Sequence, residues 1–462
     1  MKRLRAVVFG AGKMACGLLG QLLAQSGYMT LFVGRRPEVI DVINRHQGYA
    51  LNIAGDTLER LAIRHCHALS VRETGAVADA VAGADIVCTA VGIDNLAAVT
   101  PAIAEGLWQR SETRGEKPLN VVACENLPGA GAYLRHQVVS AAPLGNAIAV
   151  EDVGGFSAAL TRRIMTGGAV EHSELTFTVD ADSDLIIDSH GLKGAFPLVQ
   201  GATFTEEFPA MVMRKLFMLN GAHAVAAYLG HREGCRHVHE ATAHPRVAPV
   251  LQGAVVEATA ALKAEFPHQA EAIDREAAEA LARIANPLLA DTVSRVARGP
   301  RRKLSPRERL VGPARLASRH HLPYENLCKA IAAALTYDDP EDPQAVAMQR
   351  AIAAEGVDKV LTEDCGLLPH EELALAVKEQ WLKLVAGTAQ GLAAAGPWSW
   401  TSTTLEEIMD AVAVDLSQRY DPGLVEEVLA RVVQEFREVH VWAYVPLLMK
   451  KQASEQLHGR VR

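Results

Sequence analysis

Residues 4–17, Leu4-Arg-Ala-Val-Val-Phe-Gly10-Ala-Gly12-Lys-Met-Ala15-Cys-Gly17, decide the fold of this chain. An apolar run typical of a buried strand leads into a glycine-rich turn, and residues 18–25 then have helical character. In such a G-x-G-x-x-A pattern, Gly10 permits a tight turn, Gly12 lets the backbone approach a pyrophosphate, and Ala15 lets the helix pack closely. The pattern therefore predicts dinucleotide binding at the start of this helix. A glycine turn without a ligand is the alternative.

Strand-like and helix-like segments alternate through the first 150 residues. Residues 29–33, 85–91 and 119–124 are short apolar runs, and helical stretches lie around residues 75–81 and 97–114. This alternation predicts βαβ units with a parallel sheet, and so an α/β fold with a Rossmann-type dinucleotide-binding domain over residues 1–200.

The pattern changes from about Phe204, where long amphipathic helices begin. They predict a mainly helical substrate and catalytic domain over residues 201–384. Residues 385–403 are uncharged and rich in Gly, Ala, Ser and Thr, which predicts a linker. Residues 404–462 have the pattern of a small three-helix unit, whose second helix starts at Asp421-Pro422. Because so small a unit buries little surface alone, we expect it to dock or to form a homodimer contact.

The composition excludes several classes of protein. The chain has 462 residues, 49% apolar and 22% charged, with a net charge of −8, which is ordinary for a globular protein and argues against a nucleic-acid binder. Its seven cysteines are odd in number and widely spaced, which favours reduced thiols and a cytoplasmic location. No apolar run reaches about 18 residues, so we expect no membrane span. The group Cys235, His237, His239 and His244 matches no standard zinc spacing, so we expect no metal site.

The second strand ends in Gly34-Arg35-Arg36, where an NAD site usually has Asp or Glu. A carboxylate would repel a 2′-phosphate, whereas Arg35 and Arg36 would pair with it, so the sequence favours NADP(H) and leaves NAD(H) open. Solvated loop arginines before Pro37 are the alternative. Thr89 and Val91, at the end of another predicted strand, are candidates to lie near the nicotinamide end of the cofactor. A plain strand-to-loop turn explains these residues equally well.

Two segments carry residues suited to chemistry. One holds Lys215, Asn220 and His223, and the other is Cys124-Glu125-Asn126. On one straight helix, Lys215 and Asn220 would lie about 140° apart, so spacing alone does not bring Lys215 to the others unless a kink near Gly221 does so. A surface lysine, a helix-breaking asparagine and a buried histidine are the alternative.

Five ordered stretches carry a resemblance to a known family: GAGKMACGLLG, VVACENLPGAG, RKLFMLNGAHAVAAYLG, RVARGPRRKLSPRERL and LPYENLCKAIAAAL. Over about residues 4–380 the chain resembles the polyol-specific long-chain dehydrogenase/reductase family, which shares a K-x4-N-x2-H pattern. The resemblance implies a Rossmann domain, a largely helical substrate domain and metal-independent hydride transfer.

The resemblance also implies roles for particular residues. Lys215 would be the general acid/base, Asn220 and Asn126 would donate hydrogen bonds to the developing oxyanion, and His223 would bond a substrate hydroxyl or orient the lysine. The candidate cofactor-binding residues, from the sequence patterns and the resemblance together, are Gly10, Gly12, Lys13, Met14, Ala15, Arg35, Arg36, Thr89, Val91 and Glu125.

The basic run of residues 300–309 is suited to an anionic substrate. Arg302, Lys303 and Arg309 match a stretch shared by the resembled family and are candidates to bind the substrate phosphate. Arg163 is a further candidate. The alternative is that the basic run is simply a solvated charged face. Within the family, the chain most resembles the branch that interconverts mannitol 1-phosphate and fructose 6-phosphate. A mannitol 2-dehydrogenase, a hexuronate reductase or a non-catalytic NADP-responsive regulator remain alternatives. Arg162 stands where the family often has Asp, and our hypothesis is that this added arginine favours an anionic substrate. Residues 211–213 lack the acidic residue that commonly precedes the lysine.

Overall fold

The structure is a computed structural model that describes residues 3–114, 117–125, 129–171, 173–393, 417 and 420–436. It divides into two compact units, Met1–Leu367 and Leu368–Arg462. The first unit holds a sheet region followed by a helical region, and the second holds helices.

An eight-stranded sheet forms the N-terminal part of the first unit, in the order β12-β11-β8-β7-β6-β1-β2-β5. All neighbouring strands pair in parallel except β11 and β8, which are antiparallel. The predicted Rossmann-type parallel sheet is therefore confirmed. The strands are β1 (Arg5–Phe9), β2 (Met29–Gly34), β5 (Cys66–Ser70), β6 (Ile86–Thr89), β7 (Leu119–Ala123), β8 (Gly154–Leu160), β11 (Leu185–Asp188) and β12 (Ala202–Thr205).

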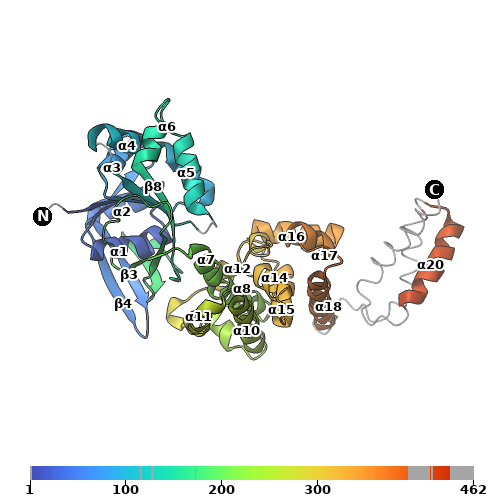
Figure 1. Ribbon diagram of the computed structural model, residues 1–462. Coiled ribbons are helices and arrows are strands. Elements are labelled where there is room, and N and C mark those ends of the chain that lie inside the picture. The colour runs from blue at the N-terminus through green and yellow to red at the C-terminus, as the bar shows by residue number, and fades with distance from the viewer. Residues whose placement is uncertain are drawn as a thin grey trace. The chain divides into compact units, whose positions relative to one another are not determined.

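The strands are apolar throughout because both faces of the sheet are covered. Alternate residues of β1 enter opposite cores: Ala6 and Val8 pack with the helices η1 and α1, whereas Val7 and Phe9 pack with α3 and α4. Figure 1 shows α3 to α6 gathered on one side of the sheet and α1 and α2 on the other. The helices are η1 (Ala15–Leu19), α1 (Gly20–Gln25), α2 (Pro37–His46), α3 (Thr74–Gly83), α4 (Ile93–Arg114), α5 (Ala130–Ser140) and α6 (Ala147–Val153).

A second sheet of four strands, in the order β4-β3-β10-β9, lies on the α1 and α2 side and was absent from the sequence-based expectation. Tyr49 ties it to the first helix, because its hydroxyl donates to the carbonyl of Cys16 over 2.6 Å. Gly20 provides the room, since a Cβ there would meet the Tyr49 hydroxyl. The strands are β3 (Gly48–Ala54), β4 (Leu58–Arg64), β9 (Ala169–Glu171) and β10 (Glu174–Asp180).

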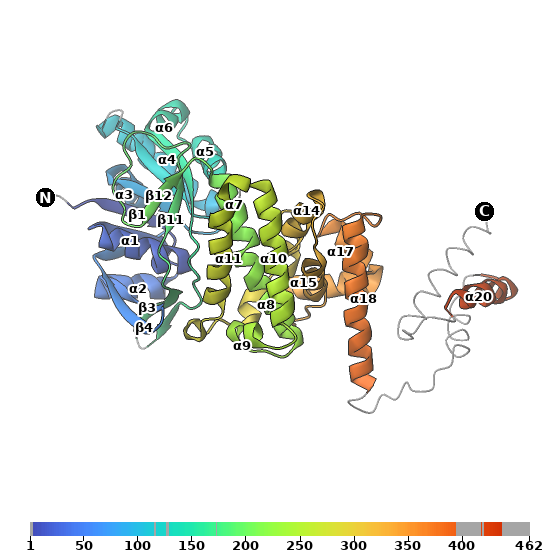
Figure 2. The same cartoon turned by 60° about the horizontal axis from the view of Figure 1, so that its bottom comes forward.

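The predicted helical region follows the sheet and is confirmed. Its helices α8, α10 and α11 lie side by side (Figure 2). The bounds are α7 (Phe208–Phe217), α8 (Leu219–Arg232), α9 (Val238–Ala243), α10 (Ala248–Glu265), η2 (Pro267–Gln269), α11 (Ala270–Ile284), η3 (Pro287–Leu289), α12 (Val293–Ala297), α13 (Pro300–Lys303), α14 (Val311–Arg319), α15 (Glu325–Leu335), α16 (Pro343–Glu355) and α17 (Val357–Glu363).

The second unit departs from the expected organisation at its start. Helix α18 (Glu372–Ala393) extends into the segment predicted as a linker, because its alanines and leucines favour a helix over the few glycines. Helix α20 (Pro422–Phe436) begins at the predicted Pro422. The other two helices expected in residues 404–462 fall outside the described residues, and the proposed domain boundaries remain predictions.

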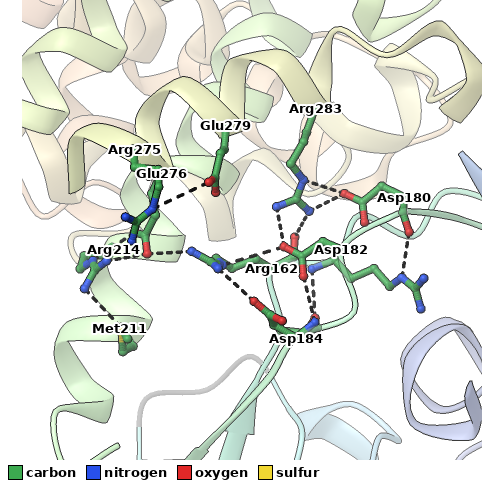
Figure 3. Close-up of polar contacts among 12 residues, drawn as sticks. Arg162, Asp180, Asp182, Asp184, Met211, Arg214, Arg275, Glu276, Glu279 and Arg283 are labelled. Atoms are coloured by element: carbon green, nitrogen blue, oxygen red, sulfur yellow. Dashed lines mark hydrogen bonds and ion pairs between the residues drawn. The ribbon is translucent and has the colours of Figure 1, made fainter. Parts of the chain in front are cut away.

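A network of charged residues joins the helical region to the sheet region (Figure 3). Arg283 of α11 donates to the carboxylates of Asp180 and Asp182 and to the carbonyl of Arg162. Arg162 pairs with Glu276 over 2.7 Å. Burial raises the pKa of Asp180 to about 6, although Arg283 opposes the shift. The network fixes α11 against residues 160–184, and so fixes the cavity described below.

Candidate active site

A cavity of about 530 Å³ lies between the carboxyl ends of the parallel strands and the helical region. Ligands of open α/β sheets bind at this edge, so the position agrees with the predicted cofactor turn. The lining residues include nine of the predicted site residues: Lys13, Met14, Arg163, Lys215, Asn220, His223, Arg302, Lys303 and Arg309. The other lining residues are Cys124, Ala159, Leu160, Thr161, Ile164, Met165, Leu219, Arg295, Val296, Arg298 and Gly299.

Positive charge dominates this cavity. Among the lining residues that the structure describes, eight are lysine or arginine and none is aspartate or glutamate. Side chains of one sign around a concave, poorly solvated wall produce a strong local potential. The cavity therefore attracts anions, although the whole chain carries a net charge of −8. The eight are Lys13, Arg163, Lys215, Arg295, Arg298, Arg302, Lys303 and Arg309.

A helix break brings Lys215 to the same cavity as Asn220 and His223. Helix α7 ends at Phe217 and α8 begins at Leu219, and Met218 between them has backbone angles of −87° and −74°. The break lies three residues before Gly221, near which a kink is needed to bring Lys215 to the other two residues. Lys215 is therefore in the last turn of α7, whereas Asn220 and His223 are in the first two turns of α8.

Burial and nearby cations lower the pKa values of the three lysines that line the cavity, Lys13, Lys215 and Lys303. Burial and the charge of Arg309 lower the pKa of Lys215 to about 8. Burial, with the charges of Arg309 and Arg302, lowers the pKa of Lys303 to about 6, and its amine donates to the carbonyl of Arg298. A lysine with a pKa near neutral is suited to proton transfer, and Lys215 has this property.

The glycine-rich turn has room for a ligand. Gly10 has a φ of +111°, and a Cβ there would approach the carbonyl oxygen of Ala90 to 2.5 Å, so only glycine fits. A Cβ at Gly12 would meet no atom within 4 Å, which leaves its backbone open to close approach. These observations fit the pyrophosphate of a dinucleotide. Lys13, which lines the cavity, donates to the carbonyl of Thr166 over 2.7 Å.

Three of the predicted cofactor residues form one hydrogen-bonded group at the ends of β6 and β7. The carboxylate of Glu125 accepts from the Thr89 hydroxyl over 2.7 Å and from the Val91 amide over 3.1 Å. Burial raises the pKa of the Glu125 carboxyl, although these two hydrogen bonds favour its ionised form. The group fixes the turns after both strands. Asn126, predicted to donate to the oxyanion, lies outside the described residues.

The two arginines after β2 are exposed beside Gly34. Arg35 donates to the Asn95 side chain over 3.0 Å, and Arg36 lies 3.9 Å from Glu38. Both guanidinium groups lie at the surface, so neither is held in the core of the domain. Their part in binding a 2′-phosphate remains a prediction.

The basic residues differ in how firmly they are held. The guanidinium of Arg163 donates to the carbonyls of Asp180 and Gly17 and to Gln21, so most of its donors hold the sheet region together. Arg302 and Arg309 both contact Glu308, which does not line the cavity. Their roles as substrate ligands remain predictions.

Sequence reasoning missed Arg295 and Arg298 of the cavity wall, although both lie in a stretch that carried the family resemblance. It also gave weight to Arg162 as an additional cation for the substrate. The structure contradicts that idea, because Arg162 is bound by Glu276, Asp182 and Asp184 and does not line the cavity (Figure 3).

The comparisons with known proteins agree with this arrangement. Residues 4–200 match the family model described as the mannitol dehydrogenase Rossmann domain, and residues 208–385 match the mannitol dehydrogenase C-terminal domain. The chain belongs to the mannitol dehydrogenase family. It is thus a polyol dehydrogenase-type oxidoreductase with a nicotinamide-cofactor-binding fold.

Two solved structures of polyol dehydrogenases share the fold. Mannitol 2-dehydrogenase of Pseudomonas fluorescens, solved as a ternary complex with NAD and D-mannitol, is 18% identical with a TM-score of 0.65. D-sorbitol dehydrogenase in substrate-free form is 14% identical with a TM-score of 0.67. Each likeness covers 86% of this chain and 95% of the other.

The described residues hold neither a membrane-spanning helix nor a cluster of metal ligands. Across these ranges, no helix has the length and apolar character needed to cross a bilayer. Nor do three or more His, Cys, Asp or Glu side chains gather in this part of the chain as ligands for a metal ion. The His237 ring stacks on His239 and contacts Glu240 instead.

The lowered pKa of Lys215 predicts the pH dependence of polyol oxidation. In the role predicted for Lys215 its neutral amine is the base, so kcat at saturating substrate should rise with pH and level off above about 8. Arg309→Gln removes the charge that helps to lower this pKa, so its profile should move to higher pH. Steady-state rates with a C–H deuterated polyol, which report when hydride transfer limits turnover, measure the shift.

The control for this prediction is Arg246→Gln, which removes an exposed arginine paired with Glu233. Its profile should match the wild type. If the midpoint of the kcat–pH profile in Arg309→Gln equals that of the wild type, this result contradicts the assignment of the rise in kcat to Lys215.

Proposed function

We propose that the chain is a mannitol-1-phosphate 5-dehydrogenase, which interconverts D-mannitol 1-phosphate and D-fructose 6-phosphate in the cytoplasm. The observation that supports a phosphorylated substrate is the cavity wall, with its eight lysines and arginines and no carboxylate among the described lining residues. A phosphate dianion matches this charge, whereas a neutral polyol leaves the cations uncompensated.

The proposed mechanism gives Lys215 the proton transfer. In oxidation its neutral amine takes the proton of the C5 hydroxyl, and in reduction its ammonium returns a proton to the C2 alkoxide of fructose 6-phosphate. Asn220, and Asn126 by resemblance, donate to the oxygen as negative charge develops on it. His223 bonds a neighbouring hydroxyl. A nicotinamide cofactor, when bound, supplies the hydride acceptor or donor.

The phosphate would be held by Arg302, Lys303 and Arg309. Lys303 is the most informative of the three, because burial and the arginines lower its pKa to about 6. A bound dianion offsets that repulsion and favours the charged amine. Substrate binding therefore relieves an unfavourable arrangement of like charges.

For the cofactor we propose NADP(H), with NAD(H) as the weaker alternative. Strand β2 ends in Gly34 and two exposed arginines, so no carboxylate stands at the end of this strand to repel a 2′-phosphate.

The cofactor proposal predicts a higher kcat/KM with NADPH than with NADH. Replacing both arginines, Arg35→Ala with Arg36→Ala, should raise KM for NADPH about tenfold or more and leave KM for NADH nearly unchanged, because only the 2′-phosphate loses its partners. Paired kinetics of wild type and variant measure this. Equal or better kcat/KM of the wild type with NADH would refute the preference.

The phosphate proposal predicts the behaviour of Lys303→Ala. Loss of a charge-assisted hydrogen bond costs about 1.5–3 kcal/mol, so kcat/KM for mannitol 1-phosphate should fall roughly 10- to 100-fold. The value for mannitol should change little, because mannitol has no phosphate to lose. Lys359→Ala, an exposed lysine paired with Glu355 and Glu363, is the control. Equal losses for both polyols would count against the assignment.

The same assays address the alternatives. A hexuronate reductase also needs cations for its substrate carboxylate, so hexuronates belong in the panel. A preference for unphosphorylated mannitol would favour a mannitol 2-dehydrogenase. Absence of turnover with every substrate would favour a non-catalytic regulator. We further propose that residues 404–462 contribute a homodimer contact; the structure describes only Ser417 and residues 420–436 of them.

A further inference from the structure

We propose that Asp291 is a positioning residue of the active site, whose one carboxylate orients His223 toward the substrate hydroxyl and holds Arg295 for anion binding. Asp291 does not line the cavity, but both of its partners do. The inference rests on the proposed function, because it assigns part of the same site.

The carboxylate of Asp291 lies between these two side chains. Its Oδ2 is 3.0 Å from Nε2 of His223, and its Oδ1 and Oδ2 accept from Nε and Nη2 of Arg295, each over 2.5 Å. Asp291 is only 4% exposed, so water does not screen these contacts. Arg295 is thus held by two parallel bonds, and His223 approaches one of the same oxygens.

The backbone around Asp291 is fixed as firmly as its side chain. Ala290 before it adopts a left-handed conformation with a φ of +45°, and the Asp291 carbonyl accepts from the Val238 amide at the start of α9. Thr292 after it caps α12 by accepting from the Arg295 amide. Because the backbone is fixed on both sides of Asp291, its carboxylate is suited to position His223 and Arg295 rather than to move with them.

The first consequence concerns the tautomer of His223. Burial lowers the pKa of His223, although Asp291 opposes the shift, so the ring is neutral near pH 7. The negative oxygen beside Nε2 favours the proton on that nitrogen, which leaves Nδ1 as the acceptor. Nε2 lies 3.0 Å from Oδ2 and has no other partner among the described residues, although the N–H is not aligned with this oxygen.

The second consequence concerns Arg295. It faces the cavity with other cations and is among the charges that lower the pKa of Lys303. Repulsion of this kind would move a flexible arginine toward solvent. Burial would raise the pKa of Asp291, but the nearby His223 and the two bonds from Arg295 outweigh it and hold the pKa at about 2. The carboxylate is therefore ionised at any working pH and keeps Arg295 in place.

The test is a pair of double-mutant cycles. Asp291→Asn keeps the shape but removes the charge, so we expect kcat to fall at least about tenfold and KM for mannitol 1-phosphate to rise. If the effect on kcat passes through His223, adding Asp291→Asn to His223→Ala should lower kcat little further. If the effect on KM passes through Arg295, adding it to Arg295→Ala should raise KM little further.

Two control variants separate positioning from general stability. Asp364→Asn removes a carboxylate that pairs bidentately with Arg301 away from the cavity. Glu265→Gln removes one shared by His320 and Arg319, the same pair of residue types. Both should lower the melting temperature without changing kcat or KM. If Asp291→Asn lowers kcat by the same factor in His223→Ala as in the wild type, and raises KM by the same factor in Arg295→Ala as in the wild type, the proposal is overturned. Equal losses in the two control variants would also overturn it.

A measurement without turnover separates this proposal from the proposed function. Nitrogen-15 NMR of histidine-labelled protein, with His223→Ala for assignment, reports the ring tautomer directly. We expect the proton on Nε2 in the wild type and a mixture of tautomers in Asp291→Asn. A proton on Nδ1 in the wild type would refute the proposal. If mannitol 1-phosphate is not turned over, the proposed function fails, and the cycles are measured with whichever polyol is oxidised.

Discussion

Repulsion among eight lysine and arginine side chains around one cavity is the constraint on which the rest of the site depends. Like charges stay close in a poorly solvated space only if something holds them. Groups that do not line the cavity hold these side chains in place. Asp291 accepts two hydrogen bonds from Arg295, Glu308 pairs with Arg309, and backbone carbonyls accept from Arg163. Burial, together with the remaining repulsion from Arg309, lowers the pKa of Lys215, and a bound anion relieves this repulsion.

The fold supplies the precision that this arrangement needs. The parallel sheet places the glycine-rich turn and the ends of β6 and β7 at one edge, where Glu125 joins their loops. Arg283 and its acidic partners attach helix α11 to the sheet region, so the two walls of the cavity keep their spacing (Figure 3). The break at Met218 then turns α7 and α8 so that both face the cavity.

Sequence reasoning predicted the parts of this structure that depend on neighbouring residues. The stretch of residues 4–17 predicted the Rossmann-type sheet, and helical periodicity predicted the second region. It could not place Lys215 with His223, because a helix break at Met218 depends on packing. It missed Asp291, which lies 68 residues from His223 in sequence. It overvalued Arg162, because the acidic residues that neutralise this arginine, such as Glu276, come from distant segments.

The central claim is that the cavity recognises its substrate through charge, and ionic strength tests it most directly. Electrostatic attraction between the cavity and a dianion weakens as salt shortens the screening length from about 30 Å at 0.01 M to about 3 Å at 1 M. We predict that kcat/KM for mannitol 1-phosphate falls at least several-fold over this range, whereas kcat/KM for mannitol stays nearly constant. Parallel salt dependence for the two polyols would contradict the account.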